Sequence, residues 1–175
     1  MPWSVLDVAR WILAEAGRQG LALTHMQLQK LLYYAQGWSL GMTGEPLFAD
    51  AMEAWEHGPV APAAYQAYRR WGSERIGDVP DDVPPPDASP LIALLVREKG
   101  QLSASALRNM THDEAPWRDA ARGGLIGLDA MREWFIPIFW GSDEEDEYQP
   151  AFDDEREERR YLLDGLTREE RDAIF

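Results

Sequence analysis

The residues of this sequence best suited to chemistry are its histidines and one nearby carboxylate. His112 and Glu114 stand two positions apart in the stretch THDEAPW, and His57 precedes a Gly-Pro pair. A His-x-Glu pair occurs in zinc deaminases, where two cysteines complete the metal site, but this chain has no cysteine. A metal-dependent hydrolase would need His57, His112 and a carboxylate to converge, and it is kept as one alternative function.

The same residues also have a structural interpretation. Thr111 and Glu114 are spaced as a capping box at the start of a helix that contains Trp117. His57 is expected to brace its turn through a ring nitrogen, and Lys30 to lie on a solvated helix face with its stem over apolar surface. The sequence has no phosphate-binding glycine loop, nucleophile elbow or kinase signature, so we predict no catalytic residue, no cofactor and no metal.

Two amphipathic helices are expected to position these residues. Thr24 and Gln27 form a capping box at the start of a helix that ends near Met42, where Gly41, Gly44 and Pro46 break the pattern. The apolar stripe of that helix consists of Leu28, Leu31, Leu32, Ala35, Trp38 and Met42. An earlier helix, which Ser4 caps and Gly17 or Gly20 ends, is expected to pack against it as an antiparallel partner.

After the second helix, residues 47–48 and 52–55 are expected to form a small β-hairpin that residues 56–59 terminate. Further helices are predicted over residues 62–71, 89–99, 102–110, 116–122 and 129–135, with a proline-rich surface loop at 77–90 and Pro137 interrupting the last helix. The predicted fold class is therefore mainly α (α+β). A compact helical domain over residues 1–140 is followed by an acidic, partly helical C-terminal extension over 141–175.

The charge of the chain narrows the possible partners. The formal net charge is -14, and acidic residues are concentrated after residue 142. Because a phosphate backbone repels negative charge, nucleic acid is an unfavourable partner and a basic protein is a better one. No basic leader or long apolar run is present, so a soluble, cytoplasmic protein with no membrane contact is expected.

Three motifs then resemble a known family. The run LQKLLYYAQGWSLGMTGEPLF at residues 28–48, AWEHGPV at 54–60 and THDEAPWRDA at 111–120 are similar to the Panacea (SocA-like) antitoxin domain of bacteria and their phages. The resemblance covers residues 5–135. It implies a mostly helical antitoxin without enzyme activity, which binds a cognate protein toxin and blocks it. In some relatives the antitoxin hands the toxin to an AAA+ protease.

The candidate partner-binding residues come from the motifs and from the extension. They are Lys30, Tyr33, Trp38, Trp55, His57, His112, Glu114, Trp117, Trp140, Tyr148, Phe152 and Tyr161. The motif residues are expected mainly to define the fold, and Trp140 and the extension are possible toxin anchors. A transcriptional regulator is the other alternative, with a helix-turn-helix-like segment over residues 103–122 whose nearby cations are Arg108, Arg118 and Arg122.

Overall fold

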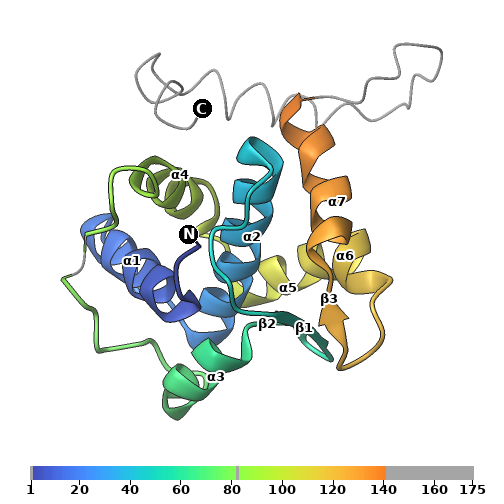
Figure 1. The fold of residues 1–175 in the computed structure, drawn as a ribbon. Helices are drawn as coiled ribbons and strands as arrows, with labels where there is room; N and C mark the ends of the chain where they lie inside the picture. The colour runs from blue at the N-terminus through green and yellow to red at the C-terminus, as the bar shows by residue number, and fades with distance from the viewer. Residues whose placement is uncertain (1, 82, 141–175) are drawn as a thin grey trace, which may run out of the picture.

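The chain folds around one central helix, α2, with the other helices and a small sheet arranged about it (Figure 1). The structure is a computed structural model that describes residues 2–81 and 83–140. The elements of this part are α1 (Val5–Arg18), α2 (His25–Thr43), β1 (Met52–Trp55), β2 (Gly58–Val60), α3 (Pro62–Tyr68), the 3-10 helix η1 (Arg69–Trp71), α4 (Ser89–Lys99), α5 (Ala104–Asp113), α6 (Ala115–Arg118), β3 (Leu125–Ile126) and α7 (Leu128–Trp140). The fold class is mainly α with a small antiparallel sheet, as predicted. No helix in this part is long and apolar enough to span a bilayer.

The predicted start and end of α2 are confirmed. Thr24 Oγ1 accepts a hydrogen bond from the Gln27 amide, and the Thr24 amide donates to Gln27 Oε1, so both halves of the capping box are present. At the other end Gly44 adopts a left-handed conformation with φ 76°, which a side chain would strain. Local sequence signals therefore fixed the length of this helix.

The polar face of α2 is buried as well as its apolar stripe, because the neighbouring segments bond to it. Gln36 Oε1 accepts hydrogen bonds from the amides of Leu47 and Phe48, and its Nε2 donates to the Phe48 carbonyl. Gln29 and Lys30 are also buried. The prediction that Lys30 lies on a solvated helix face was wrong, because its amino group is used to bond another segment of backbone.

Glycines on α2 allow α7 to pack closely against it. A Cβ atom at Gly37 would lie 2.3 Å from the Phe135 ring, and one at Gly41 would lie 2.6 Å from the Phe139 ring. The prediction that Pro137 interrupts α7 was also wrong, since the helix continues to Trp140. Packing of α7 against α2 stabilises the helix through its proline.

The hairpin prediction was wrong in its pairing. β1 pairs with β2 on one side and with β3 on the other, so the turn of the hairpin is Glu56–His57. Pro59, which was expected to stop a strand, lies opposite Ala54 in β2. Because β2 is at the edge of the sheet, the missing amide of proline costs no ladder bond. The segment of Leu47 instead bonds to Trp3, whose amide donates to the Leu47 carbonyl.

The capping box expected from Thr111 and Glu114 is absent. Thr111 lies inside α5, fully buried, and its hydroxyl donates to the carbonyl of Arg108. Glu114 is itself the N-cap residue of α6, and its side chain makes no capping bond. The third motif was expected to start one helix. It instead joins α5 to α6, and this brings the His112 ring against the Trp117 ring.

Candidate functional site

The first and second motifs meet through a buried lysine. Lys30 Nζ donates a hydrogen bond of 2.9 Å to the carbonyl of Pro59, next to the turn between β1 and β2. Gly58 makes this approach possible, because a Cβ there would lie 2.6 Å from Lys30 Cε and 3.0 Å from Thr111 Oγ1. Its φ of 103° is also one that glycine alone adopts readily. The lysine therefore fixes the hairpin to α2.

The third motif holds the same hairpin from the other side. The indole Nε1 of Trp117 donates to the carbonyl of Trp55 over 3.0 Å. The Trp117 ring stacks on His112 with centroids 3.8 Å apart, and the Arg122 guanidinium lies 4.5 Å from the same ring. The expectation that the motif residues define the fold agrees with these contacts.

A second contact ties the third motif to α2. The hydroxyl of Tyr34 donates to Glu114 Oε1 over 2.8 Å. Burial, followed by the Glu114 charge, raises the pKa of the neighbouring Tyr33 well above its ordinary value. Both tyrosines pack edge-on against Phe135 of α7. Glu114 is therefore part of a partly buried polar cluster in the helical body.

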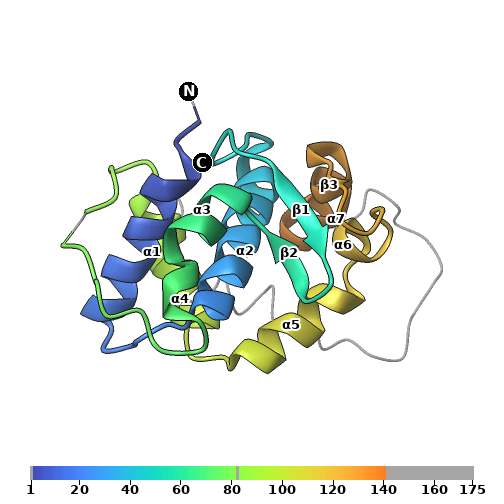
Figure 2. The same ribbon diagram turned by 90° about the horizontal axis from the view of Figure 1, so that it is seen from below.

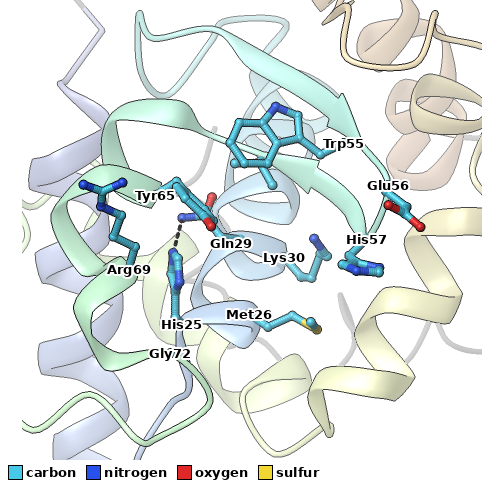
Figure 3. A pocket seen from close by; sticks show the side chains of 11 residues that line it. His25, Met26, Gln29, Lys30, Trp55, Glu56, His57, Tyr65, Arg69 and Gly72 are labelled. Carbon is cyan, nitrogen blue, oxygen red and sulfur yellow. Dashed lines mark hydrogen bonds between the residues drawn. The ribbon is translucent and has the colours of Figure 1, made fainter.

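A pocket of about 440 Å³ opens between the start of α2, the β1–β2 turn and α3 (Figure 3). Figure 2, from below, shows α3 and the hairpin lying over α2 at this place. The residues that line the pocket are His25, Met26, Gln29, Lys30, Trp55, Glu56, His57, Val60, Tyr65, Arg69 and Gly72. Its volume falls within the range of small-molecule and side-chain binding pockets.

Aromatic rings form one wall of this pocket. The Tyr65 ring lies 4.8 Å from the Trp55 ring and 4.9 Å from the His25 ring, measured between centroids. Gln29 holds the wall in place, because its Oε1 accepts a hydrogen bond from the Ala61 amide at the start of α3 and its Nε2 lies 3.3 Å from His25 Nε2. The wall is apolar with polar edges, which suits contact with a partner side chain.

Basic groups gather around the pocket and the turn. Burial, together with the nearby Arg108, lowers the pKa of Lys30 to about 7. Burial, followed by the charge of Lys30, lowers the pKa of His25. The pKa of His112 is lowered first by burial and then by Arg108, Lys30, Arg122 and His57. Basic side chains therefore lie around the turn, and their burial favours the neutral forms of Lys30, His25 and His112.

The structure separates the candidate partner-binding residues by accessibility. Trp55 is partly exposed, His57 is exposed, and Trp140 is 59% exposed while its indole donates to the carbonyl of Gly41. Lys30, Tyr33, Trp38 and Trp117 are buried, and His112 and Glu114 are half-buried. Tyr148, Phe152 and Tyr161 lie outside the described residues. Direct contact with a partner stays a prediction for each of them.

The residues of the alternative functions are arranged as follows. His57 is exposed and makes no hydrogen bond with any other described residue, so the expected brace of the turn is not formed. No three His, Asp or Glu side chains of residues 2–81 and 83–140 are grouped to hold a metal ion. Arg118 pairs with Asp119, and α6 has only 4 residues, which is short for a helix that reads a DNA groove.

Most residues of the pocket were not among the sequence candidates, and His25, Tyr65 and Arg69 are the three whose side chains add rings or a charge to it. The sequence held a local signal for His25. It lies four residues before Gln29 in α2, a spacing that puts both side chains on one face of the helix, next to Lys30. Tyr65 and Arg69 reach the pocket only through the way α3 crosses α2, which no local pattern reports. Their role depends on tertiary packing.

Comparison with known proteins supports the resemblance of the motifs. The family model described as Antitoxin SocA-like, Panacea domain, matches residues 28–83. Antitoxin SocA of Caulobacter vibrioides (strain NA1000 / CB15N) is 32% identical over 130 residues, covering 66% of this chain and 69% of that protein. No solved structure matches. On the identity and coverage of this relative, the chain belongs to the SocA-like antitoxin family with a Panacea domain.

Proposed function

We propose that this chain is the antitoxin of a toxin–antitoxin pair and neutralises a cognate protein toxin by binding it directly, without catalysing a reaction. The observation that carries the proposal is that residues of the first and second motifs meet at one accessible pocket. Lys30 from the first motif and Trp55 and His57 from the second line it. The motif residues that carry the family resemblance line an open pocket with an aromatic wall. Binding explains this arrangement better than packing alone.

The proposed mechanism is occlusion by mass action. A toxin held on this face is inactive for as long as the complex lasts, and the neutralised fraction follows the affinity and the antitoxin concentration. Transfer of the bound toxin to an AAA+ protease is a further step that we propose only as an extension. Its signature would be a toxin half-life that shortens when the antitoxin is present.

Co-expression tests the proposed class. The neighbouring open reading frame is expressed alone and then with this chain, and growth is followed. We expect growth arrest from the neighbour alone and relief by the wild-type chain. Arrest that persists with a soluble, folded antitoxin would reject neutralisation of that protein.

A matched pair of variants tests the pocket. Met26 lines it and is 36% exposed, whereas Leu6 is 37% exposed on α1 and does not line it. Each is the second residue of its helix, so a glutamate has the same helical context at both places. We expect Met26→Glu to weaken toxin binding by about tenfold or more and Leu6→Glu to leave it unchanged. Equal affinity of the two variants would move the toxin contact to another surface.

A further inference from the structure

The basic groups around the pocket lack acidic partners. Lys30, His57 and Arg69 line the pocket and form no ion pair with any described carboxylate. Glu56 is the acidic residue of the lining and is exposed at the tip of the turn. A pocket of this composition is unusual in a chain of net charge -14. An anion entering it would meet the charge of Arg69 and of Lys30 and His57 in their protonated forms.

These basic groups differ in their exposure to solvent, and this gives them two different roles. His57 and Arg69 are exposed, so their donors can reach a bound anion. Lys30 is 1% exposed, and its amino group is already bonded to Pro59. It acts from behind the pocket wall by its charge, which the low dielectric of the interior screens weakly. Arg108 of α5 adds to the same field, because its charge acts on Lys30.

The aromatic wall adds a second requirement to the ligand. Trp55 and Tyr65 both line the pocket, with their rings tilted by 55° to each other, and they offer apolar surface to an apolar or aromatic group. Figure 3 shows this pair on one side of the pocket and Lys30 and His57 on the other. A carboxylate next to a ring-bearing or apolar side chain would satisfy both sides at once.

We propose that the pocket binds an aspartate or glutamate side chain of the toxin, next to an aromatic or apolar residue of the same segment. The inference rests on the proposed function and names the chemistry of the partner at that site. The acidic surface of the chain attracts a basic toxin over a distance, and the pocket fixes the register of the complex by accepting one acidic side chain. A toxin segment with the reverse charge would leave Lys30 and Arg69 uncompensated.

Binding of a carboxylate also predicts proton uptake. Lys30 faces His25 on its own helix, His57 and the Pro59 carbonyl on the hairpin, and Arg108 and His112 on α5. His25 in turn faces Lys30, Gln29 and Tyr65. An anion among these groups favours their charged forms, so occupation of the pocket raises the pKa of Lys30.

The protein alone provides the first test. Lys30 and Lys99 are its lysines, so lysine labelled with ¹³C gives an NMR signal for the pocket and one for a reference position. The probes are the blocked dipeptides acetyl-Trp-Glu-amide and acetyl-Trp-Gln-amide, which differ in charge but hardly in shape. We expect the Glu peptide to shift the Lys30 signal saturably, to raise its pKa, and to bind about tenfold more tightly than the Gln peptide. Equal binding of both peptides, or no effect of either on Lys30, would overturn the proposal.

Charge-reversal variants provide the second test, with the toxin. Arg69→Glu and His57→Glu are compared with Arg97→Glu, whose arginine lies on α4 and does not line the pocket. We expect the pocket variants to lose toxin affinity by tenfold or more and the α4 variant to keep it. Thermal unfolding confirms that each variant is folded, and the neutral changes Arg69→Gln and His57→Gln replace any variant that is not. If the wild type neutralises the toxin and all variants bind it alike, the acidic-residue proposal fails while the proposed function stands.

Discussion

Lys30 offers the most specific prediction, because its buried amino group makes stability depend on pH. Its pKa is about 7 in the folded protein against an ordinary 10.5. Between these values the unfolded chain binds a proton that the folded chain does not, so the free energy of unfolding rises with pH. The contribution of Lys30 to stability is complete above pH 10.5 and is lost as pH falls towards 7. Lys30→Met removes this dependence, since methionine has similar length and no charge.

The size of the effect follows from the two pKa values. A full difference of one proton is equivalent to 1.36 kcal/mol for each pH unit. With Lys30 half protonated at pH 7, the free energy of unfolding of the wild type rises by about 2 kcal/mol between pH 7 and pH 9 relative to Lys30→Met. Loss of the hydrogen bond to Pro59 lowers the free energy of unfolding of Lys30→Met by about 1 kcal/mol at all pH values. It does not change how that free energy varies with pH.

Urea unfolding followed by tryptophan fluorescence measures this difference at pH 7 and pH 9 and constant ionic strength. Measurements stay below pH 10, because the raised pKa of Tyr33 lowers stability when the unfolded chain begins to ionise there. Lys99→Met, at the other lysine, is the control for loss of a lysine elsewhere in the chain, and its slope is compared with that of Lys30→Met. Parallel pH profiles for the wild type and Lys30→Met would refute the assignment of a buried amine with a lowered pKa.

Three further substitutions, with one control, test the packing of α2 and the attachment of the hairpin. Gly37→Ala places a Cβ against Phe135 and is expected to cost about 1–3 kcal/mol of stability, whereas Gly127→Ala, where no atom lies within 4 Å, is expected to be tolerated; equal melting temperatures would contradict the tight contact. Gln36→Leu leaves backbone groups of the 47–48 segment unpaired and is expected to cost about 2–4 kcal/mol by urea unfolding; a loss below 1 kcal/mol would show that water replaces the amide. Trp117→Phe removes the bond to the hairpin, with an expected loss of about 1 kcal/mol and faster amide exchange in β1; unchanged exchange there would contradict it.

Helix positions were predictable because their signals are local. Thr24, Gln27 and Gly44 mark the ends of α2 within a few residues of the backbone groups that they satisfy. The stripe of α1 and the start of α3 at Pro62 were also fixed in this way. The family assignment had the same basis, since the motifs are contiguous runs that can be recognised without knowing where they fold.

The strand pairing and the site were not predictable in this way. Pro59 looked like the end of a strand, because only the sheet order shows that its side of β2 is an edge. Lys30 looked like a surface lysine, because its partner, the Pro59 carbonyl, is 29 residues away in the chain. Both errors came from interactions between segments that a local pattern does not describe.

The sequence by itself determined the ends of α2, the starts of α1 and α3, the balance of charge, and the family to which the chain belongs. Only the tertiary structure decided that the polar face of α2 is buried, that Arg69 and Tyr65 join Lys30 and His57 at one pocket, and that basic side chains gather there. The physical reason is that capping and helical periodicity act over a few residues. Burial and electrostatic surroundings, in contrast, depend on which distant segments pack together.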